Sequence, residues 1–369
     1  MWTISENVFD PRRLHHHETI FTIGNGYLAT RGAFEEGYAG DRRATFIHGV
    51  FDAAPIVVTE LANAPDWLPL TVHLDGERFG LDRGTLEAFD HTLDLRSGVL
   101  TRTVRWRSPA GQGLRLTFER FASLARPHQL LLRCRLAAES AGRLEVRAAL
   151  NGHMHNDGLL HWEHVDQGSA PDGAIYLHNR TRTSGHQAAL AMRWVTTAGH
   201  ERAREFWDVE DHPTLSVTLD AAAGEEIVLD KFVAVFTSRD VAAERVVAEA
   251  LGEVRAVRDW DTALAANQAA WQVEWERTDV EIEGDDEAQV AVRFNLFQML
   301  IAAPRHDDRV NIGAKTLSGF GYRGHAFWDT EIFMLPLFTY TAPHIAPQPA
   351  QLPLSPPARR ARESPRQRF

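Results

Sequence analysis

A short segment near the end of the chain holds the residue types best suited to chemistry. Residues 321–336 read GYRGHAFWDTEIFMLP and bring aromatic rings close to carboxylates. The face of an indole can pack on the C–H face of a sugar ring, while a carboxylate accepts hydrogen bonds from the sugar hydroxyls. The composition of this segment therefore indicates a sugar-binding site. The alternative is an aromatic-rich core helix that Asp329 caps.

Asp329 and Glu331 do not suit the pair of carboxylates that glycosidic cleavage uses. On a helix, residues two apart point to different faces, and only on a strand would they share one. Cleavage usually needs two carboxyl groups roughly 5 to 9.5 Å apart across the scissile bond. We therefore interpret Asp329 as a sugar-binding residue and not as the proton donor.

Other clusters of reactive residue types favour structural roles. Residues 24–31 (GNGYLATR) lack the lysine and the following helix of a phosphate loop, and we interpret them as a turn between strands. The run His15–His17 before Glu18 is more typical of a solvated loop than of a metal site. Four further histidines lack a clear ligand spacing: His153, His155, His161 and His164. We predict no metal site, and Cys134, placed mid-strand among apolar neighbours, gives no support for nucleophilic catalysis.

Composition excludes several classes of protein. The 369 residues carry 39 basic and 50 acidic side chains, a formal net charge of −11. This balance argues against nucleic-acid and anionic-membrane binders, which carry a basic stripe. The single cysteine excludes an intrachain disulfide framework. No apolar run approaches the roughly 18 residues of a membrane helix, and no signal peptide is visible, so we expect a cytoplasmic protein without a membrane partner.

Residues 1–237 show the pattern of a large antiparallel β-sandwich. Apolar and polar residues alternate in seven segments: 70–74, 98–106, 114–121, 129–136, 143–150, 215–219 and 227–236. The dipeptide Asp75–Gly76 favours a tight hairpin after the first of them. Turn signals separate the others, and no helical pattern intervenes, which together predict the sandwich.

The periodicity changes near Ser238, and residues 238–302 are predicted to form a helical linker. Its helices are expected at residues 241–252, 254–277 and 285–303. Ser238 is available to cap the first helix, and Asp285 or Asp286 the third. Pro304 ends the third helix, whose apolar stripe consists of Val290, Phe294, Phe297 and Ile301.

Residues 346–369 differ in composition from everything before them. They contain six prolines, five arginines and one acidic residue. Such a segment cannot bury enough apolar surface to pack, so we predict disorder. A frameshift or a misassembled gene would explain the abrupt change, and the alternative is a natural disordered tail on a truncated paralogue.

Six stretches in order resemble glycoside hydrolase family 65, which comprises maltose, trehalose and kojibiose phosphorylases and related trehalose hydrolases. They are IGNGYLATRGAFEE (23–36), FIHGVFD (46–52), PDW (65–67), DKFVAVFTSRD (230–240), VEIEGDDEAQVAVRFNLFQML (280–300) and GAKTLSGFGYRGHAFWDTEIFMLP (313–336). Each stretch is weak alone, but the six together are specific and cover nearly the whole chain up to residue 344 or 346. Phe320 departs from the family pattern, which usually has glutamate there.

The resemblance implies a fold and a site. The fold is a galactose-mutarotase-like sandwich, a helical linker and an (α/α)6 barrel, of which residues 303–345 would form only the start. The pair Trp328–Asp329 looks like the family's pair that holds the glucosyl unit of the substrate. Four further residues lie in the same motif and are expected beside that sugar: Tyr322, Arg323, His325 and Glu331.

The resemblance also implies cleavage of an α-glucosidic disaccharide such as trehalose, maltose or kojibiose, by inverting phosphorolysis or by hydrolysis. A carboxylic acid protonates the leaving oxygen, and in a phosphorylase inorganic phosphate attacks the opposite face without any cofactor. The family's general acid lies well downstream of FWDTE, so we expect no catalytic residue within this sequence and an inactive chain. The alternative is a non-catalytic sugar-binding or scaffolding module. A homodimer would suit the resemblance, and the sequence leaves the disaccharide and the oligomeric state open.

A single barrel helix cannot bury both of its faces alone. We therefore expect an exposed apolar patch made of Phe327, Phe333, Leu335 and Phe338. Aggregation, or proteolytic trimming back to about residue 303, would follow from such a patch.

Overall fold

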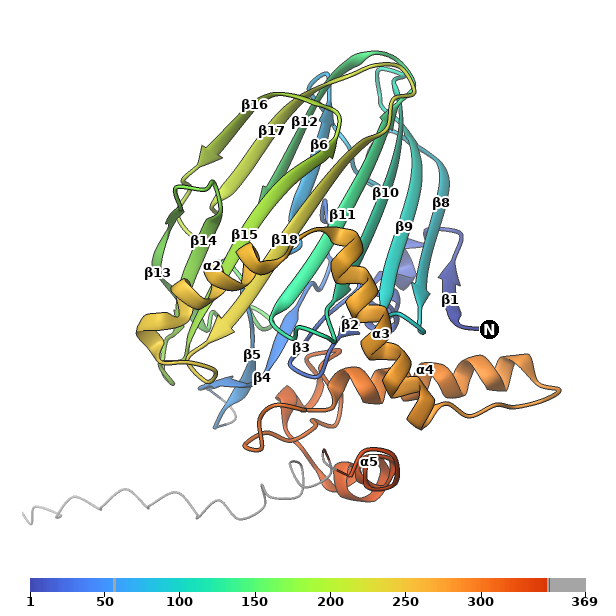
Figure 1. Ribbon diagram of the computed structural model, residues 1–369, viewed down its shortest axis with the longest axis vertical. Coiled ribbons are helices and arrows are strands. Elements are labelled where there is room, and N and C mark those ends of the chain that lie inside the picture. The colour runs from blue at the N-terminus through green and yellow to red at the C-terminus, as the bar shows by residue number, and fades with distance from the viewer. Residues whose placement is uncertain (56–57, 344, 346–369) are drawn as a thin grey trace, which may run out of the picture.

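Antiparallel sheets fill the first two thirds of the chain, and helices follow (Figure 1). The structure is a computed structural model that describes residues 1–55, 58–343 and 345. The tail predicted to be disordered, residues 346–369, lies outside the described residues. Among the described residues the last strand ends at Thr237, and the described segments after it are helices and loops.

Two large sheets form the sandwich. The nine-stranded sheet has the order β1 (Thr3–Glu6), β8 (Thr85–Asp94), β9 (Val99–Arg107), β10 (Gly113–Ala122), β11 (Gln129–Ala138), β18 (Ile227–Thr237), β15 (Gln187–Ala198), β14 (Ile175–Thr181) and β13 (Trp162–Ser169). The five-stranded sheet has the order β16 (His200–Trp207), β17 (Thr214–Ala221), β12 (Gly142–Ala149), β6 (Leu70–Leu74) and β7 (Glu77–Arg78). Neighbouring strands pair antiparallel, which confirms the predicted sandwich.

A small third sheet lies at the lower end of the sandwich (Figure 1). It contains β2 (Ile23–Gly24), β3 (Leu28–Thr30), β4 (Thr45–Asp52) and β5 (Glu60–Asn63). The turn predicted in residues 24–31 is confirmed at residues 25–27, which connect β2 and β3, whereas Leu28–Thr30 of the same stretch form β3 itself. β5 of the β4–β5 hairpin contacts the turn at residues 321–324, which belongs to the aromatic motif.

Burial differs from strand to strand according to how many faces are covered. β6 and β9 alternate buried and more exposed residues, because one face packs in the core and the other faces outward. The Asp75–Gly76 hairpin is confirmed, with positive φ at both residues (49° and 87°). β18 is buried along its whole length, because α2 covers its second face (Figure 1).

One prediction for the β-rich block was wrong. A helix, α1 (Leu14–Ile20), interrupts it, so the run His15–His17 lies on a helix and not in a loop. The 3-10 turn Pro11–Arg13 leads into this helix, and the Asp10 carboxylate accepts a hydrogen bond from the Arg12 amide at 3.0 Å. An acidic cap followed by proline is a helix-start signal that a search for strand alternation does not detect.

Three helices follow the sandwich: α2 (Val246–Ala256), α3 (Trp260–Thr278) and α4 (Asp286–Ala302). The bounds of α2 differ from the prediction. It has no side-chain cap, and it continues through residue 253, where one predicted helix was expected to end and the next to begin. The Ser238 hydroxyl instead accepts a hydrogen bond from the Gln187 amide at 3.0 Å. Asp285 caps α4 as predicted, accepting from the Ala288 amide at 2.9 Å. Among the described residues, no helix is long and apolar enough to cross a membrane.

The buried face of α4 differs from the predicted apolar stripe. It comprises Gln289, Arg293, Phe297, Leu300, Ile301 and Ala302, whereas Val290 and Phe294 are only half-buried. Arg293 is buried because it forms a two-pronged ion pair with Asp279 (both 2.8 Å) and lies 3.8 Å from the centre of the Trp2 ring. A satisfied guanidinium can therefore occupy a core position that hydrophobicity alone assigns to an apolar residue.

Candidate functional site

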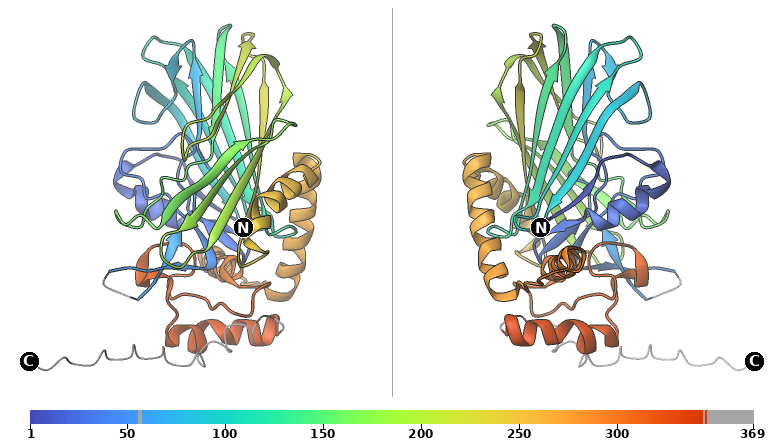
Figure 2. Two further views of the ribbon diagram at one scale, coloured as in Figure 1. Left: turned by 90° about the vertical axis from the view of Figure 1, so that its left-hand side faces the viewer. Right: turned by 90° about the vertical axis from the view of Figure 1, so that its right-hand side faces the viewer.

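The aromatic motif lies below the sandwich and begins as a turn that becomes a helix (Figure 2). Residues Gly321–Gly324 form a 3-10 turn, and Thr330–Met334 form a π-helical turn that continues into α5 (Leu335–Thr341). The amide of Leu335 donates a hydrogen bond to the carbonyl of Thr330, five residues earlier. Pro336 has no amide hydrogen to donate back along the helix, which favours this local widening.

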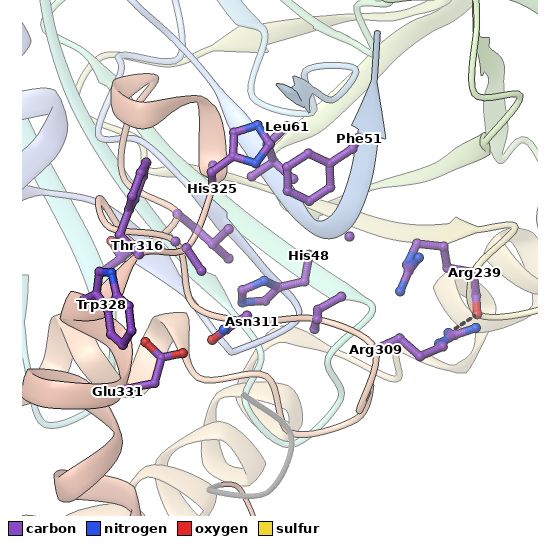
Figure 3. Close-up of a pocket in the computed structure, with 17 residues that line it drawn as sticks. His48, Phe51, Leu61, Arg239, Arg309, Asn311, Thr316, His325, Trp328 and Glu331 are labelled. Carbon is purple, nitrogen blue, oxygen red and sulfur yellow. Dashed lines mark hydrogen bonds between the residues drawn. The ribbon is translucent and has the colours of Figure 1, made fainter. Parts of the chain in front are cut away.

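A cavity of about 670 Å³ separates this motif from the β4–β5 hairpin and the end of β18 (Figure 3). Its size suits a disaccharide-sized ligand. Three predicted site residues line it: His325, Trp328 and Glu331. The Trp328 ring is 79% exposed and lies beside the Glu331 carboxylate in Figure 3. An open indole next to a carboxylate is the combination expected to bind one sugar ring.

The other predicted residues lie elsewhere. Tyr322 and Arg323 line a smaller neighbouring cavity of about 360 Å³, which shares His325 and Phe327 with the first. Asp329 belongs to the lining of neither of these cavities. Since Asp329 lies on the helix that begins at Trp328, it and Glu331 point to different faces, in agreement with the spacing argument.

The core-helix alternative for this motif does not hold. Asp329 makes no side-chain capping hydrogen bond, and several large side chains of the segment are exposed rather than packed. Phe320, the departure from the family pattern, contacts the ring of Phe46 edge-on at 5.2 Å and lies beneath the guanidinium of Arg42 at 5.0 Å. Phe320 thus packs against a small apolar cluster that includes Phe46 and Leu61.

Sequence reasoning missed three further residues that line the cavity: His48, Arg239 and Arg309. The two arginines lie on the side away from Trp328 (Figure 3). His48 donates from Nε2 to the Ala302 carbonyl at 2.8 Å, and burial lowers the pKa of His48 to about 4, so the ring is neutral near pH 7. His48 and Arg239 lie within two of the stretches that carry the family resemblance, which is the signal that could have found them.

The two arginines share one carboxylate. Arg239 pairs with Asp307 at 2.5 Å and Arg309 pairs with it at 2.7 Å. Burial opposes ionisation of Asp307, but hydrogen bonds from Arg309 and Arg239 outweigh it and lower its pKa to about 2. Two guanidinium groups share one carboxylate, so these three residues make this side of the cavity polar and leave it with one net positive charge. Within the part of the chain that the structure describes, no group of three or more His, Cys, Asp or Glu residues is arranged to hold a metal ion.

Comparison with known proteins assigns the chain to a family. Residues 4–273 match the profile of the glycosyl hydrolase family 65 N-terminal domain, and residues 293–351 match that of the family's central catalytic domain. The chain belongs to glycosyl hydrolase family 65. This confirms the resemblance seen in the six stretches.

Several family 65 relatives are similar over most of this chain. A kojibiose phosphorylase from Halothermothrix orenii is 35% identical, and an alpha,alpha-trehalose phosphorylase from Thermoanaerobacter brockii is 31% identical. Each alignment covers 94% of this chain but only 46% and 48% of the relatives. A solved structure described as a putative kojibiose phosphorylase from human microbiome has the same fold, with a TM-score of 0.88 at 24% identity over 94% of this chain and 48% of that one. The family 65 chain thus spans about half the length of these relatives.

The helical segment 328–341 of this family 65 chain, together with Phe327 before it, exposes part of the predicted apolar patch. Phe333 and Tyr340 are 77% and 86% exposed, and Phe327 is also exposed. The prediction was wrong for Phe338, which is fully buried in the main core cluster, and Leu335 is half-buried. The helix therefore has one packed face and one open apolar face.

Replacing Phe333 by serine is expected to reduce self-association of the purified chain. The substitution removes a large exposed apolar side chain and no core contact, so the free energy of unfolding should change little. Light scattering against protein concentration measures the effect. Val209→Ser, which removes an isolated exposed apolar residue from the sandwich, is the control and should leave scattering unchanged. Equal scattering from wild type and Phe333→Ser would contradict the prediction.

Proposed function

We propose that this protein binds the glucosyl unit of an α-glucosidic disaccharide in the 670 Å³ cavity and takes part in its cleavage by inorganic phosphate. The observation that carries the proposal is the placement of Trp328, Glu331 and His325 together around this cavity. The relatives support the reaction class, because they are named as phosphorylases of kojibiose, trehalose, nigerose and 1,2-alpha-glucosylglycerol. Each of these compounds contains an α-glucosyl group.

Each side chain has a proposed role. Trp328 packs on the C–H face of the sugar, and Glu331 accepts hydrogen bonds from its hydroxyls. His325 donates from Nε2 to the Thr59 carbonyl at 2.7 Å, which leaves Nδ1 as an acceptor in the neutral ring. Asp329 resembles the acidic member of the family's Trp–Asp pair, but it has no role in this proposal because it lines neither cavity.

The proposed reaction is a single displacement. A carboxylic acid gives a proton to the glycosidic oxygen while a phosphate oxygen forms a bond to the anomeric carbon from the opposite face. The products are a glucosyl phosphate and the released sugar or alcohol. No cofactor is required, because phosphate is itself the nucleophile. We assign the general acid to none of the described residues.

Trp328→Ala is expected to weaken sugar binding by roughly tenfold, because the alanine removes the stacking surface. Calorimetric titration with glucose, kojibiose and trehalose measures the loss. Trp207→Ala, at a half-exposed tryptophan of β16 in the sandwich, is the matched control and should keep wild-type affinity. Equal losses in the two variants, or no loss in either, would overturn the assignment of the cavity.

An assay for released glucose phosphate tests the reaction itself. The purified protein is incubated with kojibiose or trehalose and inorganic phosphate. Release of sugar phosphate supports the phosphorylase proposal. Binding without release favours the non-catalytic sugar-binding module, and absence of both rejects a role in disaccharide chemistry.

A further inference from the structure

A buried row of charged side chains connects the sandwich with the motif turn. Asp52 ends β4 and Glu60 begins β5, and the two are paired across the hairpin. His161, just before β13, lies between them, with Nδ1 at 3.1 Å from Asp52 and Nε2 at 2.8 Å from Glu60. All three side chains are at most 3% exposed. Such a group must be fully hydrogen-bonded, because water cannot solvate it.

His161 joins the two carboxyl groups, because each of its ring nitrogens lies within hydrogen-bond distance of a carboxyl oxygen. The other oxygen of Asp52 accepts from the amides of Thr183 (3.1 Å) and Ser184 (2.7 Å), between β14 and β15. Burial opposes ionisation of Asp52, but these amides and His161 outweigh it and lower its pKa. The sandwich therefore holds this end of the row rigidly.

The other end of the row reaches the motif. The second oxygen of Glu60 forms an ion pair with Arg323, and the adjacent Thr59 carbonyl accepts from His325 at 2.7 Å. The row holds two buried carboxyl groups, and Arg323 is the cation that pairs with Glu60. An uncompensated buried charge is costly, so the sandwich has a strong electrostatic preference for Arg323 in this position.

The turn that carries Arg323 needs external support. Tyr322 and Arg323 both have positive φ (54° and 55°), a conformation that costs non-glycine residues energy and persists only where surrounding contacts impose it. At Gly324 the turn approaches β5 so closely that an added Cβ would lie 2.5 Å from the Leu61 side chain. The hairpin and the turn are thus fitted to each other.

We infer that Glu60 and His161 are positioning residues of the sugar site, which hold the strained turn at 321–325 through Arg323 and so direct His325 into the cavity. This inference rests on the proposed function. It changes the role of Arg323, whose guanidinium is engaged by Glu60 and acts on the sugar through the turn rather than by contact. His325 and Trp328 then enter the cavity in fixed positions (Figure 3).

Arg323→Gln tests the inference from the more exposed side of the ion pair, since the Arg323 side chain is 40% exposed and that of Glu60 is 3% exposed. We expect amide hydrogen exchange to rise at least tenfold in residues 318–327, with no change in the sandwich strands, and sugar affinity to fall several-fold. Arg323→Lys should restore part of both effects, because it keeps the charge. Arg180→Gln, which breaks the exposed Arg180–Glu163 pair between β13 and β14, is the control and should change neither.

Glu60→Gln removes the same ion pair from the buried side and should give the same two changes. Weaker sugar binding in Arg323→Gln without faster exchange would mean direct sugar contact, and faster exchange with unchanged affinity would mean a purely structural role. Either result overturns the inference. A wild-type protein that binds no sugar rejects the proposed function instead, and the exchange measurement then still decides whether Glu60 anchors the turn.

Discussion

Arg102→Leu is expected to lower the free energy of unfolding by about 3–5 kcal/mol. Arg102 lies on β9 with its side chain 2% exposed and donates to Glu35 and to Glu36, each at 2.7 Å. Its guanidinium also lies between the rings of Phe34 and Phe118, 4.5 and 4.6 Å from their centres. Leucine would leave the buried Glu36 carboxylate without its cation. Removing only one partner of a buried ion pair destabilises the folded state strongly, because the remaining charge is neither paired nor solvated.

Urea unfolding followed by circular dichroism measures this loss. Arg107→Leu is the matched control, because Arg107 lies on the same strand but pairs with the exposed carboxylates of Glu87 and Glu139. Exposed pairs are worth about 0–1 kcal/mol, so this variant should unfold almost as wild type does. Similar losses in the two variants would contradict the account of the buried cluster.

Lys231 is expected to make the protein more stable as pH rises from 7 to 9. Burial lowers the pKa of Lys231 to about 7, with Asp66 opposing the shift and Arg43 adding to it. Between pH 7 and the ordinary lysine pKa of about 10.4, the unfolded chain binds more protons than the folded one, so the free energy of unfolding increases with pH. The gain over this interval is on the order of 2 kcal/mol.

Lys231→Met should remove this gain. The Lys231 ammonium donates to the carbonyls of Pro69 (3.1 Å) and Ala149 (2.9 Å), so the variant also loses these hydrogen bonds, mainly as a pH-independent offset. The measurement is the difference in unfolding free energy between wild type and variant at several pH values. Lys315 is the other lysine in the sequence and is exposed, so Lys315→Met should keep the wild-type slope. Parallel curves for wild type and Lys231→Met would reject the prediction.

All seven predicted segments are strands, and in β6 and β9 the alternation records a difference in burial between two faces. The rule is not general, because β18 was predicted although both of its faces are buried, and β14 alternates in burial but was not predicted. β13 and β16 are largely exposed or half-buried along their length and carry no such record. The two predicted helix caps differ in a similar respect. Asp285 caps its helix through the amide of Ala288, three residues later, which is a local contact that the sequence can predict. The Ser238 hydroxyl instead accepts a hydrogen bond from the amide of Gln187 at the start of β15, which is a long-range contact.

The sequence by itself determined the sandwich, the family and the motif around Trp328, because alternation and short motifs are local properties of the chain. Only the tertiary structure decided how the predicted residues divide between two cavities. It also brought Glu60 and His161, which are 101 residues apart, into contact and placed Arg323 beside them. The position of His161 in the sequence did not predict its partners, because Asp52 and Glu60 lie on the distant β4–β5 hairpin. Long-range ion pairs follow from chain topology and burial, and neither can be read from neighbouring residues.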